Sequence, residues 1–112
     1  EIFRALALRG AQIVFVIAQF AQSRIEHFIT LARARAIENQ IFICAVNDCG
    51  DTGQGESFGG NSMLINPYGE IVARLGKKEA VKIARANLDE ILKFRAKMDL
   101  LKDMKPEIYK EF

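Results

Sequence analysis

The stretch of this sequence with the most obvious chemical potential is the glycine-rich segment at residues 53–60, GQGESFGG. Residues 55–59 fit the pattern G-x-S-x-G, which is the nucleophile elbow of many serine hydrolases. In such an elbow a buried strand leads into the serine, a helix leaves it, and the acid and histidine of the triad follow later. Here glycine and polar residues precede Ser57, no helix signal follows it, and the single histidine, His27, comes earlier. The sequence therefore favours a polar loop over a catalytic serine.

A nucleotide-binding loop is excluded on similar grounds. The dinucleotide pattern G-x-G-x-x-G would need a glycine where Phe58 stands. The segment also leads into no helix whose N-terminus could hold a phosphate. We therefore expect no cofactor.

The two cysteines, Cys44 and Cys49, are not in C-x-x-C spacing, and one histidine cannot complete a four-ligand zinc site with them. Cys44 lies in an apolar run and is typical of a small core residue. Cys49 has Asp48 and Asp51 beside it, whereas a reactive thiolate needs a base or positive charge. A disulfide is allowed in principle, but two cysteines beside an ordinary core favour reduced thiols in the cytoplasm. We expect no metal site, and we expect His27 to be partly buried on a helix.

Composition bounds the class of protein. The chain has 112 residues, of which 50% are hydrophobic and 27% charged, which suits one folded domain and excludes disorder. A net charge of +2 does not indicate a basic surface for binding nucleic acid or an anionic membrane. The longest apolar run, residues 13–18, is far too short to span a bilayer. We therefore expect a cytoplasmic protein without nucleic-acid or membrane partners.

The first half of the chain predicts a strand–helix–strand unit. Apolar residues at helical spacing start the chain, and Gly10 ends that run. Ser23 and Glu26 form S-x-x-E, which predicts a capping box at the start of the next helix. Continuous apolar runs predict strands that are buried on both faces. The predicted elements are a helix over 1–9, a strand over 13–18, a helix over 24–39 and a strand over 41–48.

The second half predicts an antiparallel meander and a last helix. Residues 49–60 should form a loop, and the turn at 66–69, with Pro67 and Gly69, should join strands at 62–65 and 70–75. Alternation predicts a further strand over 79–87, and Asn87 or Asp89 should cap the last helix. The tail from residue 103 should be irregular, because Pro106 breaks a helix. This order predicts an α+β fold, a mixed sheet with helices on one face.

The segment RARAIEN carries the clearest electrostatic pattern. Arg35 and Glu38 are three residues apart on one helix face and can form an ion pair. Asn39 can end the helix in the left-handed conformation. Alanines at positions 32, 34 and 36 indicate close packing against another element. We therefore expect a structural, partly buried ion pair.

Taken in order, RARAIENQIFICAVN, GGNSMLINPYGEIVA and ANLDEI resemble the C-terminal half of the nitrilase, or carbon–nitrogen hydrolase, superfamily. Ser62, Pro67 and Gly69 match the hairpin motif of that family, and the tail KPEIY resembles the C-terminal arm of its ω-amidase-like branch. The resemblance covers the whole chain. It implies that residues 1–112 are a partial domain, the C-terminal half of a four-layer α-β-β-α sandwich. Half a sandwich would expose an apolar sheet face and should associate with other chains.

The resemblance also implies a chemistry. Family members hydrolyse amides or nitriles with a cysteine nucleophile, a glutamate base and a lysine that stabilises the tetrahedral intermediate. The nucleophile lies in a motif of the type C-Y-D-x-R-F-P-E, and residues 1–4 match only its end. We therefore expect all three catalytic residues upstream of Glu1, and we assign neither Cys44 nor Cys49 to that role.

What remains for this chain is support of the site and of assembly. The resemblance implies a substrate-pocket edge at Gln19, Phe20 and Asn47, and a homodimer through the helices at 1–9 and 24–39. The residues with expected structural roles are Arg35, Glu38, Asn39, Ser62, Pro67 and Gly69.

Two functions follow as hypotheses. The first is a fragment, inactive alone, of a cysteine-dependent amidase that converts a small carboxamide, such as the ω-amide of a dicarboxylate, to acid and ammonia. The second is a non-catalytic interaction module that binds partners through its sheet and helix face. The sequence preceding Glu1 distinguishes them, because only the enzyme needs the nucleophile motif there.

Overall fold

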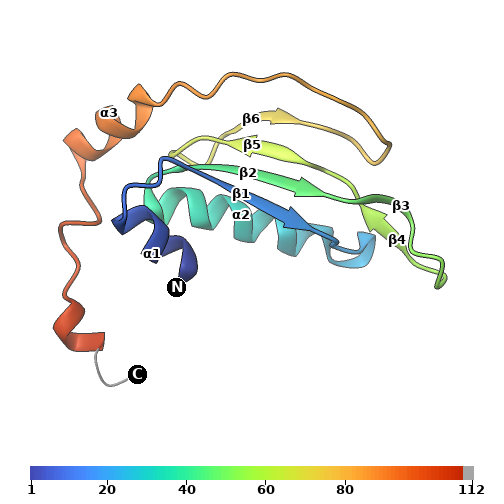
Figure 1. Ribbon diagram of the computed structural model, residues 1–112, viewed down its shortest axis with the longest axis horizontal. Helices are drawn as coiled ribbons and strands as arrows, with labels where there is room; N and C mark the ends of the chain where they lie inside the picture. Colours follow the sequence, from blue (N-terminus) through green and yellow to red (C-terminus); the bar gives the residue numbers. More distant parts are fainter. Residues whose placement is uncertain (110–112) are drawn as a thin grey trace.

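A mixed sheet with helices on one face forms the body of the computed structural model, which describes residues 1–109 (Figure 1). Helix α1 (Ile2–Leu8) precedes strand β1 (Ile13–Ala18), and helix α2 (Ile25–Asn39) connects β1 to β2 (Phe42–Asn47). The two strands pair in parallel, from Ile13 opposite Phe42 to Ala18 opposite Asn47. The predicted strand–helix–strand unit and the α+β class are confirmed.

A hairpin extends this sheet beyond β2. Strands β5 (Met63–Ile65) and β6 (Ile71–Arg74) run antiparallel, which gives the order β1-β2-β5-β6. In the turn, the Gly69 N–H donates to the Asn66 carbonyl at 2.9 Å, and Gly69 has a φ of +81°. A Cβ on Gly69 would also stand 2.6 Å from Ile37 Cδ1 of α2. The predicted turn is confirmed, and its glycine is needed for conformation and for packing.

The core lies between α2 and the sheet. Ile43 and Ala45 of β2 are fully buried against the helix face that carries Phe28, Ala32 and Ala36. The alternate side chains of β2 point to the other face, where Ile91 of helix α3 (Asp89–Lys97) packs in a small cluster with Phe42 of β2 and Leu64 of β5. Further along this second face Phe15 is 64% exposed and Ile17 79% exposed. One face of the sheet is therefore sealed by helices and the other is largely open.

The predicted capping box at Ser23 and Glu26 is wrong. A 3-10 turn, η1 (Gln22–Arg24), precedes α2, and no side chain caps the helix. The Ser23 hydroxyl instead donates to the carboxylate of Glu56, in the hairpin of β3 (Cys49–Asp51) and β4 (Ser57–Gly59). Ala21 forms a bridge with Phe58 of the same hairpin. These tertiary contacts take the place of the local cap. The prediction that residues 49–60 form only a loop is therefore wrong, because β3 and β4 pair there as a hairpin.

Helix α2 ends at Asn39, as predicted, but the left-handed residue lies one position later than predicted. Gln40, with a φ of +52°, takes the left-handed position, while Asn39 stays helical and fully buried. The Asn39 side chain donates to the Arg35 carbonyl at 2.9 Å. The Gln40 side chain accepts from the Leu100 N–H at 3.2 Å, and this fastens the segment after α3 to the end of α2.

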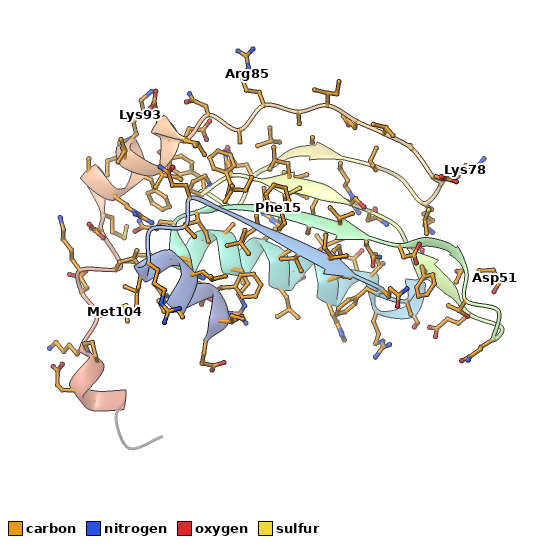
Figure 2. All side chains as sticks on the ribbon, in the orientation of Figure 1. Phe15, Asp51, Lys78, Arg85, Lys93 and Met104 are labelled. Carbon is orange, nitrogen blue, oxygen red and sulfur yellow. The ribbon has the colours of Figure 1, made fainter. Side chains whose placement is uncertain are left out.

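The predicted strand at 79–87 is also wrong. Between β6 and α3 the chain is extended but forms no strand, and Val81 and Ile83 are each 95% exposed (Figure 1). Arg85 points away from the sheet (Figure 2), whereas the Lys82 amino group donates to the Arg74 carbonyl at 3.3 Å. Alternation reports β-propensity, but a strand also needs a neighbouring strand with free hydrogen-bonding groups.

The C-terminal elements fit the sequence in part. The Asn87 side chain accepts from the Asp89 N–H at 3.2 Å, so Asn87, of the two candidates, stabilises the start of α3. Pro106 begins the 3-10 helix η2 (Pro106–Tyr109) rather than breaking one, because proline has no N–H to leave unpaired at a helix start. The rest of the predicted tail, 110–112, lies outside the described residues. Within residues 1–109, no helix is long and apolar enough to cross a bilayer.

The expected ion pair between Arg35 and Glu38 is present, but it is not deeply buried. The two side chains are 36% and 44% exposed, and the Arg35 guanidinium lies 5.9 Å from the centre of the Phe3 ring. Solvent screens such a pair strongly, so its contribution to stability is small.

We expect Arg35→Ala to lower the free energy of unfolding by no more than about 1 kcal/mol. Ile65→Ala, at a fully buried position of β5, should cost about 2–5 kcal/mol because it opens a cavity. Urea unfolding followed by circular dichroism measures both. A loss of several kcal/mol in the arginine variant would show that Glu38 is buried in the folded assembly.

Candidate functional site

Three loops meet where the parallel strands β1 and β2 end. The last paired residues are Ala18 and Asn47, and the Asp48 N–H still donates to the Ala18 carbonyl at 3.0 Å. Beyond this point lie residues 19–21 after β1, the β3–β4 hairpin after β2, and residues 60–62 before β5. The carboxyl ends of parallel strands are where loops of α/β sheets gather to bind ligands. This end of the sheet is therefore the candidate site.

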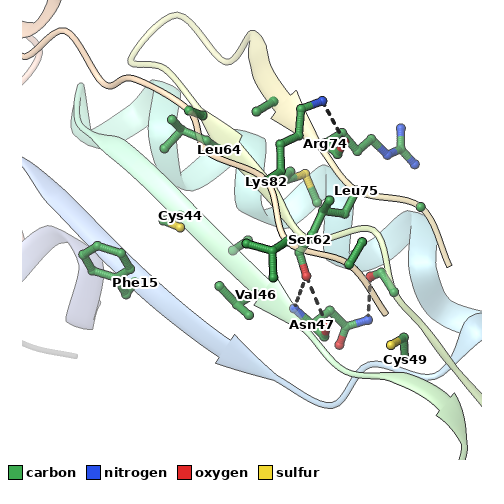
Figure 3. Close-up of a pocket in the computed structure, with 18 of the residues that line it drawn as sticks. Phe15, Cys44, Val46, Asn47, Cys49, Ser62, Leu64, Arg74, Leu75 and Lys82 are labelled. Carbon is green, nitrogen blue, oxygen red and sulfur yellow. Dashed lines mark hydrogen bonds between the residues drawn. The ribbon is translucent and has the colours of Figure 1, made fainter. Parts of the chain in front are cut away.

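Asn47 is the residue that joins these loops. Its side-chain oxygen accepts from the Phe20 N–H at 2.6 Å, and its amide nitrogen donates to the Phe20 carbonyl at 3.1 Å and to the Gly60 carbonyl at 2.9 Å. Its backbone N–H donates to the Ser62 hydroxyl at 3.0 Å, and that hydroxyl donates to the Asn47 carbonyl at 3.1 Å (Figure 3). With Asn47 only 7% exposed, these bonds are shielded from competing water.

The entry to β5 depends on two further residues. Gly60 has a φ of +57°, and a Cβ there would stand 2.6 Å from the Gly76 carbonyl oxygen, so only glycine fits. Asn61, which also has a positive φ, donates from its side chain to the Gly59 carbonyl at 2.7 Å and accepts from the Arg74 Nε at 2.9 Å. The sequence offered the glycine signal for this bend but no signal for the role of Asn61.

The predicted pocket-edge residues Gln19 and Phe20 lie next to this network. The Gln19 side chain is exposed and donates to the Asp48 carboxylate at 3.3 Å. The Phe20 ring packs on Phe28 of α2, with ring centroids 5.3 Å apart. The structure thus brings Gln19, Phe20 and Asn47 together, while their role beside a substrate remains a prediction. Asp48, which lies directly after β2, is the polar partner of Gln19, and no sequence pattern indicates this contact.

A cavity of about 520 Å³ lies on the open face of the sheet, with this network at one end. Phe15, Cys44 and Val46 line it from β1 and β2, and the extended segment with Val81 and Lys82 passes over it (Figure 3). Most of the lining is apolar, so the cavity continues the uncovered sheet face.

None of the chemically suggestive residues forms a catalytic pair. Burial raises the pKa of the Cys44 thiol, which keeps it protonated at neutral pH. Both cysteines are free, and within residues 1–109 neither thiol hydrogen-bonds to a histidine or a carboxylate. Ser57 is exposed and opens β4, with no helix behind it. His27 is exposed on α2, so the prediction that it is partly buried is wrong.

Metal binding has no support in the described part of the chain. Residues 1–109 contain no group of three or more histidine, cysteine, aspartate or glutamate side chains placed to hold an ion. The arrangement can therefore position loops and shape a pocket edge, but it holds no nucleophile with its base.

Comparison with known proteins gives the family. The sequence model of the carbon-nitrogen hydrolase family matches residues 1–96. This chain belongs to the carbon–nitrogen hydrolase family. It is 36% identical over 110 residues to the hydrolase in the agr operon of Staphylococcus aureus, covering 98% of this chain and 42% of that protein. It is 33% identical over 109 residues to the 2-oxoglutaramate amidase of Bacillus subtilis, covering 97% of this chain and 42% of that protein. It is 31% identical over 110 residues to human deaminated glutathione amidase, covering 97% of this chain and 34% of that protein.

Solved structures agree on the fold. A carbon–nitrogen hydrolase from Helicobacter pylori superposes with a TM-score of 0.85 at 24% identity, covering 97% of this chain and 43% of that one. An amidase from a Nesterenkonia species superposes with a TM-score of 0.77 at 31% identity, covering 98% and 38%, and its structure carries a covalent acetamide adduct on the active-site cysteine. The chain spans about 42% of the length of the first two relatives. It is therefore a part of the nitrilase fold.

The raised pKa of Cys44 predicts how this thiol reacts. Because only the thiolate is nucleophilic, iodoacetamide should label Cys44 more slowly at neutral pH in the folded chain than in urea. The midpoint of labelling against pH should lie above that of the unfolded thiol. Mass spectrometry of the peptide that contains Cys44 gives both quantities. Faster labelling in the folded chain would identify an activated cysteine.

Proposed function

We propose that this chain is the C-terminal part of a cytoplasmic, cysteine-dependent amidase that hydrolyses a small carboxamide to a carboxylic acid and ammonia. The observation that carries the proposal is the family match over residues 1–96, together with amidases among the relatives that exceed 30% identity over nearly the whole chain. The free cysteines fit a reducing compartment.

The architecture supports a division of labour between this chain and the rest of such an enzyme. This chain contributes a helix layer, a sheet and the loops at the ends of β1 and β2. Phe15 (Figure 2) stands exposed on the sheet face away from α2. Ile17, two residues further along β1, is exposed as well, and a second sheet would bury both. The remaining part would then supply the cysteine, the glutamate and the lysine, to complete a four-layer sandwich.

The reaction follows from those three groups. The glutamate base takes the thiol proton and the thiolate attacks the carbonyl carbon; the C–N bond then breaks as the nitrogen takes up that proton and leaves as ammonia, and water hydrolyses the thioester to release the acid and the thiol. In this chain Gln19, Phe20 and Asn47 would form one edge of the pocket. The substrate class we propose is the ω-amide of a dicarboxylate, since one relative is named for 2-oxoglutaramate.

The outer helix face supports the proposal of a homodimer through residues 1–9 and 24–39. Five apolar side chains of α1 and α2 are exposed: Ile2, Leu6, Leu8, Leu31 and Ile37. A helix layer that exposes apolar side chains is suited to association when they meet in one surface.

A non-catalytic interaction module is the second candidate. The open sheet face favours it, because an uncovered apolar surface binds partners whether or not the assembly has an active site. A nucleophile motif in the sequence preceding Glu1 would argue for the enzyme, and its absence would argue for the module.

We expect the 112-residue chain alone to release no ammonia from succinamate, because it lacks the catalytic groups. Addition of a polypeptide with the matching N-terminal half should give activity. An enzyme-coupled ammonia assay measures both. Hydrolysis by the 112-residue chain alone, at a rate above that of buffer, would refute this assignment of the catalytic groups.

The complete enzyme with Cys44→Ala and Cys49→Ala should remain active, because neither cysteine is assigned as nucleophile. Loss of activity in a variant that still folds, as judged by its circular dichroism spectrum and melting temperature, would assign one of these thiols to the reaction. The Ile65→Ala variant serves as a control for loss of stability without loss of a thiol.

A further inference from the structure

We infer that Asn47 is a positioning residue, which fixes the loop after β1 at the pocket edge without itself binding the substrate. The structural part of this inference stands on the contacts of the described residues. Its consequence for catalysis rests on the proposed amidase function.

The Asn47 side chain acts as an additional peptide group beside Phe20. A backbone residue offers one N–H and one C=O, and a carboxamide carries the complementary oxygen and N–H₂. Asn47 pairs with both groups of Phe20, at 2.6 Å and 3.1 Å, and its second N–H donates to the Gly60 carbonyl at 2.9 Å. One side chain thus joins the loop after β1 to the segment that enters β5.

The need for this side chain arises where the parallel ladder stops. Backbone pairing between β1 and β2 ends at Ala18 and Asn47, so β2 no longer pairs with the next residues of the loop, and beyond them Ala21 forms only an isolated bridge with Phe58 of β4. A backbone N–H or C=O that is shielded from water and left without a partner destabilises the fold. Asn47 supplies both partners for Phe20, and the Gly59 N–H adds a bond to the Phe20 carbonyl at 2.8 Å. The backbone of Phe20 is therefore fixed from two separate segments.

The same contacts separate the roles of the predicted pocket-edge residues. Both N–H groups of the Asn47 side chain are engaged, and the residue is 7% exposed. Gln19, which precedes the fixed residue, keeps an exposed side chain whose partner is the exposed Asp48. Asn47 therefore holds the loop, and the exposed Gln19 side chain is the group that the loop presents, while the Phe20 ring packs on Phe28 of α2.

No other side chain reproduces these three bonds. Aspartate keeps the bond from the Phe20 N–H but cannot donate, and it sets a negative charge against two carbonyl oxygens. Serine is too short to reach both segments, and glutamine adds a methylene to a packed site.

The test compares Asn47→Asp with Asn66→Asp in the complete enzyme that contains this chain. Asn66 is similarly buried, at 6% exposed, and its side-chain oxygen accepts from two backbone N–H groups where that of Asn47 accepts from one, but Asn66 lies in the turn at the opposite end of the sheet. The same chemical change is therefore made at two ends of one sheet. Hydrogen–deuterium exchange and steady-state kinetics with succinamate are measured for each.

We expect Asn47→Asp to accelerate exchange in residues 18–21 and 59–61 and to leave 42–46 protected. It should raise KM and lower kcat/KM on the order of 100-fold, because the pocket edge is displaced. Asn66→Asp should lower the melting temperature while exchange at 18–21, KM and kcat/KM stay at wild-type values. If Asn47→Asp does not fold, Asn47→Ser is measured in its place, with the same expected direction.

Unchanged exchange at 18–21 in the Asn47 variant would overturn the inference. Faster exchange there with unaltered KM and kcat/KM would overturn the positioning role in the reaction. If the wild-type enzyme hydrolyses no amide, the proposed function fails, and the exchange measurement still decides whether Asn47 holds the loop.

Discussion

The parallel pairing of β1 with β2 is the constraint on which the rest of the structure depends. Parallel neighbours need a crossover connection, and α2 provides it while it covers one face of the sheet. The pairing also places both carboxyl ends at the same edge, with Ala18 beside Asn47. Residues 19–21 and the segment entering β5 are far apart in sequence, and this pairing, together with the antiparallel pairing of β2 with β5, brings them within reach of one asparagine side chain.

The two faces of the sheet differ in what covers them. The sequences of β1 and β2, IVFVIA and FICAVN, are apolar on both sides, which is typical of strands buried on two faces. Within residues 1–109, α1 and α2 cover one side and α3 reaches only a corner of the other. Phe15 and Ile17 are therefore suited to a partner layer. This chain spans about 42% of the length of its first two relatives. A further layer in such longer proteins would explain why β1 and β2 are apolar on both faces.

Periodic patterns predicted the elements well where packing within the chain supports them. The strand predicted at 13–18 coincides with β1, and Pro67 and Gly69 give the expected hairpin turn. The predictions failed where a distant contact decides the local structure. Ser23 bonds to the β3–β4 hairpin instead of its own helix, and the Gln40 side chain is held by the segment after α3. Residues 79–87 carry a strand pattern, but the described sheet offers them no pairing. Propensities and patterns of neighbouring residues give no information about these distant contacts.

The candidate site shows the same limit at the level of single atoms. The family resemblance predicted Gln19, Phe20 and Asn47 as one pocket edge. Their spacing in the sequence does not show which of them contacts a substrate and which supports the loop. The structure distinguishes them by hydrogen-bond capacity, because a carboxamide has only two N–H groups and both of those on Asn47 serve the backbone. A residue so engaged can act on a substrate only through the loop it holds. Any recognition of a substrate at this edge must then come from side chains that are not engaged in this way. Asn47 influences those side chains by fixing the position of the Phe20 backbone in the loop.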